Sequence, residues 1–141
     1  MAEFGLDPAF VATSQALGDL RLCEARLQRD ARYPWIVLIP RRPGLREIED
    51  LSPADRIALM DEIVLAGDAV RAVGAALGLA VDKLNVGALG NVTPQLHVHV
   101  LGRRLGDPAW PGPVWGHSPA EAFAPTALEA AVVAAKTALN L

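Results

Sequence analysis

The sequence has few of the features that would place the protein outside the cytoplasm. Cys23 is its single cysteine, which excludes an internal disulfide, so a reducing cytoplasm is the simplest compartment. No apolar run reaches the roughly 18 residues of a membrane span, and the first residues lack the basic and apolar regions of a signal peptide. The net charge of -3 is too small to attract nucleic acid or a membrane surface by a long-range field. We therefore expect no nucleic-acid partner and no membrane partner.

What the sequence does contain is enough apolar residues for one packed domain. Its 141 residues are 52% hydrophobic, within the size range of a single domain spanning residues 1–141. Alternating or continuous apolar runs predict strands, and three- to four-residue apolar spacing after capping residues predicts helices. The strands that we expect lie at 20–28, 35–39, 82–86 and 95–101, and the helices at 7–16, 53–77, from 118, and 126–139. This order indicates an α+β fold with an antiparallel sheet.

The helix at 53–77 has the clearest boundaries. Ser52 is suited to the N-cap, Pro53 to the first helical position, and Gly78 to the position just after the last turn. Apolar residues and glycines recur along it at steps of three and four, namely Ile57, Met60, Val64, Gly67, Val70, Val73 or Gly74, and Leu77. We expect this stripe of Ile, Met and Val to face the core.

Two of the three histidines lie in one short stretch, Gln95-Leu96-His97-Val98-His99-Val100-Leu101. Polar and apolar residues alternate here, which predicts a strand with Gln95, His97 and His99 on one face. The apolar residues between them would pack into the core on the other face. Gly87 and Gly90 lie in the preceding loop, either because the backbone must approach a ligand there or because a turn needs positive φ.

Three interpretations of the histidine pair are open. A neutral imidazole can attack phosphorus and form a phosphohistidine, provided that its second nitrogen is held as a donor. Alternatively, two histidines two residues apart on a strand can bind one metal ion, but this needs a third ligand, and His117 is the only other histidine. The two rings can also be structural groups that only form hydrogen bonds.

The histidine stretch resembles the motif of the histidine triad (HIT) family, His-x-His-x-His-x-x with apolar x. His97 matches the middle histidine, His99 the third, and Gln95 stands in place of the first. The resemblance covers roughly residues 20–116, which leaves residues 118–141 as a C-terminal helical extension. It implies a HIT-like sheet of about five strands with one long helix packed on it.

By this resemblance the catalytic residues are His97, His99 and Gln95, with His97 as the nucleophile. It implies a nucleotide hydrolase or transferase acting at the α-phosphate of a nucleoside phosphate derivative, with no cofactor and no metal. A nucleotide-binding module with little or no catalysis is the alternative. The resemblance also assigns substrate contacts to Asp30, whose carboxylate suits the ribose hydroxyls, and to Asn85 and Asn91 near the phosphates.

Two departures from the family pattern bear on catalysis. Gln95 keeps a donor and an acceptor but cannot change its charge, so it cannot shuttle a proton. Trp35 stands where many HIT proteins carry a further histidine, and an indole is a donor only.

Cys23 has no visible base near it in the sequence and is interpreted as a packing residue. HIT proteins are commonly homodimers, and the proline- and glycine-rich loop that carries Trp110 and Trp115 would suit a cover for the core, a partner subunit or a ligand.

Overall fold

The computed structural model describes residues 2–141, and in this part of the chain five strands form one antiparallel sheet. The strands are β1 (Ser14–Asp19), β2 (Cys23–Gln28), β3 (Trp35–Pro40), β4 (Lys83–Gly87) and β5 (Val98–Arg103). They lie in the order β1-β2-β3-β5-β4, and each neighbouring pair is antiparallel. The predicted α+β class and the hairpin of β2 and β3 are confirmed.

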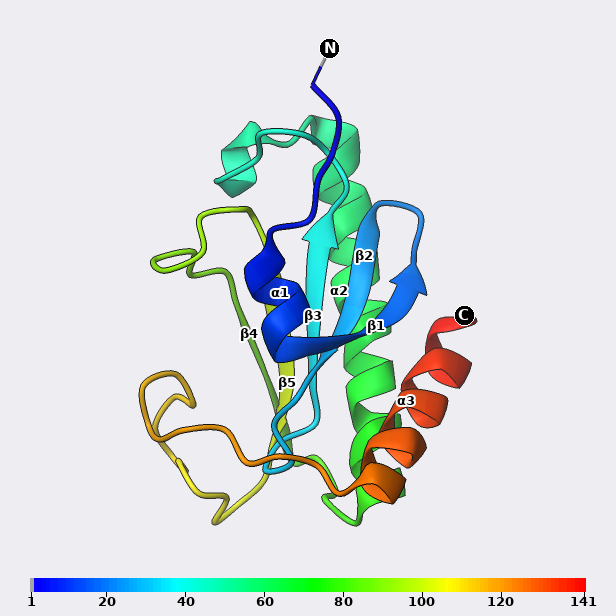
Figure 1. Ribbon diagram of the computed structural model, residues 1–141, viewed down its shortest axis with the longest axis vertical. Coiled ribbons are helices and arrows are strands. Elements are labelled where there is room, and N and C mark those ends of the chain that lie inside the picture. Colours follow the sequence, from blue (N-terminus) through cyan, green and yellow to red (C-terminus); the bar gives the residue numbers. More distant parts are fainter. Residues whose placement is uncertain (1) are drawn as a thin grey trace.

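Different elements cover the two faces of the sheet. The long helix α2 (Pro53–Leu77) lies on one face, with α3 (Pro125–Leu139) beside it. The short helix α1 (Pro8–Thr13) lies on the opposite face (Figure 1). Two apolar clusters result, a large one between the sheet and α2 with α3, and a smaller one beneath α1 and the loop at 104–116. No helix within residues 2–141 is long and apolar enough to span a membrane.

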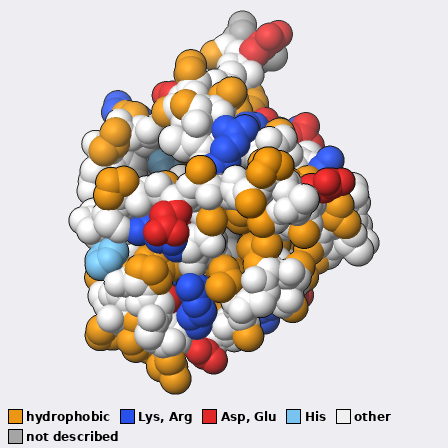
Figure 2. Space-filling view, turned by 60° about the horizontal axis from the view of Figure 1, so that its bottom comes forward, with side chains coloured by type: hydrophobic (Ala, Val, Ile, Leu, Met, Phe, Trp, Pro, Cys, Tyr) orange, Lys and Arg blue, Asp and Glu red, His pale blue; other side chains and the backbone are white. Residues whose placement is uncertain are grey.

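Charged side chains of both signs are interspersed over the surface that Figure 2 shows. This agrees with the small net charge of the chain. Apolar side chains lie between them in small groups on this face (Figure 2). This side of the molecule therefore presents no large electrostatic field of one sign that would attract a polyanion or a polycation.

The boundaries of α2 agree with the sequence prediction, but its buried face agrees only in part. The Ser52 hydroxyl accepts a hydrogen bond from the Asp55 N–H at 3.1 Å, and Gly78 ends the helix with a φ of 70°. The predicted core stripe is wrong in its first half, since Ile57, Met60 and Val64 are 67%, 59% and 63% exposed, and is confirmed in its second half, where Gly67, Val70 and Val73 are buried. The buried residues of the helix are Leu59, Glu62, Ala66, Gly67, Ala69, Val70, Val73 and Gly74. Apolar residues also lie on the exposed side of its first half, so their spacing alone does not identify the face that packs there.

Two other segments differ from the prediction because they form hydrogen bonds with distant parts of the chain instead of helices. The helix predicted at 7–16 ends at Thr13, and the next six residues form β1, the strand that the sequence prediction missed. The helix predicted from Ser118 does not form, whereas the helix predicted at 126–139 is found as α3. The carbonyls of Ser118 and Glu121 accept hydrogen bonds from the Arg32 side chain at 3.2 Å and the Ala31 N–H at 2.8 Å. This segment is held extended against the β2–β3 turn and cannot coil at the same time.

Candidate active site

The strand β5 presents its histidines on the face of the sheet opposite α2. Val98 and Val100 are buried in the cluster beneath α2, and Leu96, just before the strand, packs there too. His97 and His99 alternate with them and lie among residues that contact the smaller cluster. The predicted division of this stretch into an apolar face and a polar face is therefore found in the structure.

His97 is held in a single tautomer by the main chain. Its Nδ1 lies 2.7 Å from the carbonyl oxygen of Gln95, and because a carbonyl can only accept, Nδ1 must carry the proton. The other nitrogen, Nε2, then keeps its lone pair. The ring is 6% exposed, and the edge of Phe10 packs on it with the ring centroids 4.7 Å apart. With Nδ1 fixed as the donor, Nε2 is the nitrogen that carries the lone pair in the neutral ring, which is the arrangement that a nucleophile needs.

His99 is held in the opposite tautomer by a side chain. The Nε1–H of Trp35 donates to its Nδ1 at 3.0 Å, so the proton of the neutral ring lies on Nε2. Burial, the larger cause, and the nearby His97 together lower the pKa of His99 to about 4. His99 is thus neutral at pH 7 and offers Nε2–H as a donor. The two histidine rings lie with centroids 4.8 Å apart, so the free nitrogen and the donor belong to one site.

Gln95 lies beside the histidines, but its side chain is engaged elsewhere. Its Oε1 accepts from the Asp7 N–H, and its Nε2 donates to the Gly5 carbonyl, both at 2.8 Å. The resemblance to the HIT family implied that Gln95 is one of the catalytic residues. In the structure both of its polar atoms instead bind the N-terminal segment.

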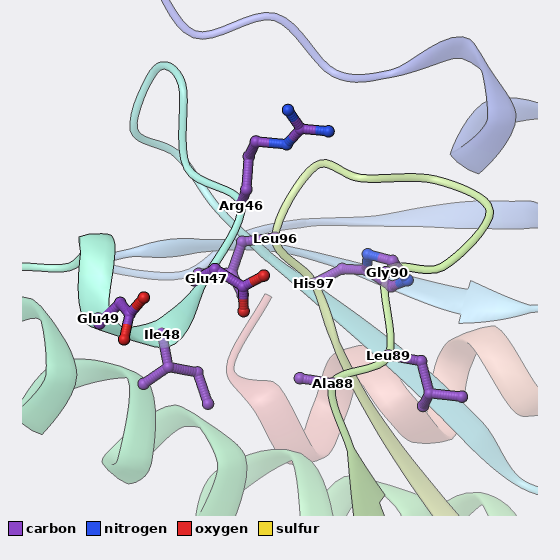
Figure 3. Close-up of a pocket in the computed structure, with 9 residues that line it drawn as sticks. All are labelled: Arg46, Glu47, Ile48, Glu49, Ala88, Leu89, Gly90, Leu96 and His97. Atoms are coloured by element: carbon purple, nitrogen blue, oxygen red, sulfur yellow. The ribbon is translucent and has the colours of Figure 1, made fainter.

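A pocket opens beside His97, between the loop that follows β3 and the loop that follows β4. Figure 3 shows the Glu47 carboxylate and the His97 ring on opposite sides of it. Gly90, with a φ of 72°, turns the second loop toward the pocket, which favours the interpretation of this glycine as a turn residue. The lining residues are Arg46, Glu47, Ile48, Glu49, Ala88, Leu89, Gly90, Leu96 and His97.

The three predicted substrate-binding residues lie at different distances from this pocket. Asn91 is exposed and follows Gly90 on the pocket loop. Asn85 lies on β4 opposite Leu101, and its Oδ1 accepts from Arg103 at 3.0 Å. 

Asp30 is only 2% exposed, and its two oxygens accept from the Arg32 guanidinium at 3.0 and 2.8 Å. It lies in the turn before β3, whose first residue, Trp35, pairs with Leu101 two residues along from His99. The structure therefore brings His97 and His99 together, and it engages the side chains of Asp30 and Asn85 with Arg32 and Arg103.

Other residues at the site were not predicted to belong there. Phe10 covers His97 from α1, which no local pattern indicated. Trp115 packs on His99 with centroids 5.4 Å apart, and a Cβ at Gly87 would lie 3.1 Å from its ring, so the glycine makes room for the indole. The loop that carries Trp115 was predicted to cover something, and it covers the histidine face of its own chain. Glu47 came from a charged connection whose sequence carries no motif.

The fold and the site together define a class of protein, an antiparallel α+β domain that carries paired histidines, one on β5 and one just before it. One ring has a free nitrogen and the other a free N–H. Residues 2–141 contain no group of three histidine, cysteine or acidic side chains placed to hold a metal ion. The free nitrogen of one ring and the N–H of the other suit nucleophilic attack with hydrogen-bond support.

Comparison with known proteins agrees with this class. The model of the HIT domain matches residues 9–106, so the chain belongs to the HIT-domain family. A histidine triad protein from Bradyrhizobium japonicum is 38% identical, with 98% of this chain and 99% of that chain covered and a TM-score of 0.90.

Two further solved structures are similar over nearly the whole chain. A histidine triad protein from Sinorhizobium meliloti is 39% identical, covering 95% and 96% of the two chains, with a TM-score of 0.85. One from Marinobacter aquaeolei is 36% identical, covering 99% and 98%, with a TM-score of 0.89. No curated protein matches the chain.

Proposed function

We propose that this protein binds a nucleotide and acts as a hydrolase or nucleotidyl transferase at the α-phosphate of a nucleoside phosphate derivative. The observation that carries the proposal is the hydrogen bond from His97 Nδ1 to the Gln95 carbonyl, because it leaves Nε2 as the free nucleophile. A dinucleoside polyphosphate or a nucleoside phosphoramidate would supply the phosphorus. Membership of the HIT-domain family supports a nucleotide as the ligand.

The reaction has two steps. His97 Nε2 attacks the α-phosphorus, a P–N bond forms, and the bond from phosphorus to the leaving group breaks. The leaving group departs with the bonding electron pair and takes up a proton. Water, or an acceptor in the transferase case, then attacks the same phosphorus, releases the nucleoside monophosphate or its adduct, and restores His97.

The role of His99 is to stabilise charge on the phosphate. Its Nε2–H, free because Trp35 occupies Nδ1, can donate to a non-bridging oxygen that gains charge in the transition state. Because its pKa is about 4, the ring keeps this one donor across the neutral range.

The pocket beside His97 would receive the rest of the substrate. The Glu47 carboxylate suits hydroxyl or amine groups better than phosphate. Asn91, on the loop that follows β4, could donate to the phosphates. We assign no substrate contact to Asp30 or Asn85, since their oxygens are bonded to Arg32 and Arg103.

A second candidate is a nucleotide-binding module without significant turnover. Two departures from the HIT pattern, Gln95 and Trp35, favour this candidate. Neither side chain can give a proton to a poor leaving group. Binding of AMP by calorimetry, with no release of product from any substrate, would select this candidate.

The test uses two substrates with different leaving groups. A diadenosine polyphosphate and an adenosine phosphoramidate are incubated with the wild type and with His97→Ala, and AMP is followed by chromatography. We expect AMP release from at least one substrate by the wild type and a loss of at least about 1,000-fold in His97→Ala, because no other described group replaces the nucleophile. Full turnover by His97→Ala would contradict the proposal.

We also propose that the protein is a homodimer in the cytoplasm. β4 lies at the edge of the sheet, so one side of its backbone is open to pairing. Beside it, Val86 on β4 and Ile57, Met60 and Val64 on α2 are each more than half exposed. A second copy related by a two-fold axis would cover this apolar face.

The buried thiol of Cys23 and the lack of a second cysteine fit a reducing compartment.

A further inference from the structure

The side chain of Gln95 joins two parts of the chain that are distant in sequence. Its Oε1 accepts from the Asp7 N–H and its Nε2 donates to the Gly5 carbonyl, each at 2.8 Å, across 88 and 90 residues. These two hydrogen bonds are called the clasp below. An amide satisfies a backbone donor and a backbone acceptor at once, as a neighbouring strand would.

The clasp leads directly to the His97 ring. Asp7, held by Gln95, is the N-cap of α1, and its carboxylate accepts from the Ala9 N–H at 2.9 Å. Its carbonyl accepts from the Phe10 N–H at 3.1 Å. Phe10, 6% exposed, then packs its edge on the His97 ring. Release of the clasp would therefore free the segment that closes one side of His97.

Gln95 thus acts on His97 from two directions. Its carbonyl oxygen, 2.7 Å from Nδ1, sets the tautomer, and its side chain holds Phe10 in place through the clasp. Any residue at this position supplies the carbonyl. Only an amide of this length supplies the clasp, because a carboxylate has no donor and the nitrogens of an imidazole point along diverging lines.

We propose that Gln95 is a positioning residue, whose side chain clasps residues 5–7 so that Phe10 forms one wall of the site and holds the His97 ring with Nε2 presented to phosphorus. The N-terminal segment is then part of the active site. This inference rests on the proposed function for its kinetic consequence, but the clasp itself is measurable without turnover.

The experiment removes the clasp from each end in the full-length chain. Gln95→Met keeps the length of the side chain and removes both of its hydrogen-bonding groups. Asp7→Pro removes the N–H that Gln95 accepts, and the φ of -60° at Asp7 fits proline. Asp7→Ala is the matched control, because it loses the same N-cap carboxylate but keeps the N–H. The double variant Gln95→Met/Asp7→Pro completes a cycle.

We expect Gln95→Met and Asp7→Pro each to lower kcat about tenfold with a smaller change in KM, since a displaced nucleophile loses its attack geometry. The double variant should lose no more than the worse single variant, and Asp7→Ala should lose less than Asp7→Pro. Gln95→His, although it completes the three-histidine pattern of the family, should also lower kcat. If the losses in kcat of the two single variants multiply in the double variant, Gln95 acts on the substrate directly and the proposal is overturned.

Two measurements without substrate separate the clasp from the proposed function. Hydrogen exchange should be faster at Asp7 in Gln95→Met, and acylation of His97 by diethyl pyrocarbonate, mapped by mass spectrometry, should be faster as well. The exposed His117 serves as the internal standard for the reagent. Unchanged exchange and acylation in Gln95→Met would overturn the clasp even if Asp7→Pro does not fold. If the wild type releases no AMP while both measurements respond, the proposed function fails and the clasp stands.

Discussion

At the scale of the residue, the site depends on which nitrogen of each histidine is occupied. A main-chain carbonyl occupies Nδ1 of His97, and the Trp35 indole occupies Nδ1 of His99. The first partner accepts and the second donates, so the rings expose opposite functions, a lone pair and an N–H. The N–H of Trp35 thereby supports the neutral form of His99.

Trp35→Phe should raise the pKa of His99. The indole N–H bonds only to the neutral ring, so its loss removes a contribution that favours that form, while burial still disfavours the charged form. The pKa should therefore move upward from about 4 toward its ordinary value, and part of His99 should be charged at pH 5 in the variant. Histidine-selective NMR titration measures this shift.

Trp115→Phe is the control for that titration. Trp115 contacts the His99 ring through its aromatic face or edge, without a hydrogen bond between the two. Its substitution should therefore move the pKa of His99 less than Trp35→Phe does. A larger effect from Trp115→Phe would contradict the role that we assign to the Trp35 N–H.

At the scale of the element, α2 holds the start of β2 through a buried carboxylate. Glu62 is 7% exposed, and its two oxygens accept from the N–H groups of Leu22 and Cys23 at 2.9 and 2.8 Å. These donors lie at the turn between β1 and β2, where no strand partner satisfies them. Burial raises the pKa of the Cys23 thiol, and the Glu62 charge adds to this effect, so the thiol stays protonated. This agrees with the interpretation of Cys23 as a packing residue.

Glu62→Ala should lower the free energy of unfolding by about 2–4 kcal/mol, because two buried N–H groups lose their acceptors. Asp61→Ala, at the neighbouring exposed position, is the control and should change it by less than about 0.5 kcal/mol. Urea unfolding followed by circular dichroism measures both. Equal stability of the two variants would show that water replaces the carboxylate at these donors.

At the scale of the whole molecule, the part of α2 that was predicted to face the core remains uncovered. The exposed Ile57, Met60 and Val64 lie on this helix, and exposed Val86 lies on the edge strand β4. Residues of α2 and β4 also line one shared apolar pocket. The two Trp residues of the 104–116 loop are not part of this face, since Trp110 packs on Arg103 and Trp115 on His99. We therefore place the proposed dimer contact on α2 and β4.

Met60→Lys should convert the proposed dimer to a monomer, since a second copy would have to bury the added charge. Val133→Lys is the control, because Val133 is equally exposed at 59% but lies on α3. Light scattering after size-exclusion chromatography gives the mass of each protein. A wild-type mass of one chain would contradict the dimer, and a dimeric Met60→Lys would move the contact away from this face.

The elements that local chemistry specifies could be predicted closely. The α2 boundaries follow from Ser52, Pro53 and Gly78, whose effects act within one helical turn. β1 and the segment before α3 could not be predicted, because their conformations depend on pairing with β2 and on bonds to the β2–β3 turn. The buried face of α2 could be predicted only in its second half, at Gly67, Val70 and Val73, since apolar residues also lie on the exposed side of its first half.

By itself the sequence determined the α+β class, the strand with His97 and His99 on one face, and the likeness to the HIT family. These follow from residue alternation and motif spacing, which need no distant contact. Only the tertiary structure decided the tautomer of each histidine, the Trp35 hydrogen bond and the engagement of the Gln95 amide by residues 5–7. The reason is that the direction of a hydrogen bond depends on the partner that folding brings to it, and for Gln95 that partner lies about 90 residues away.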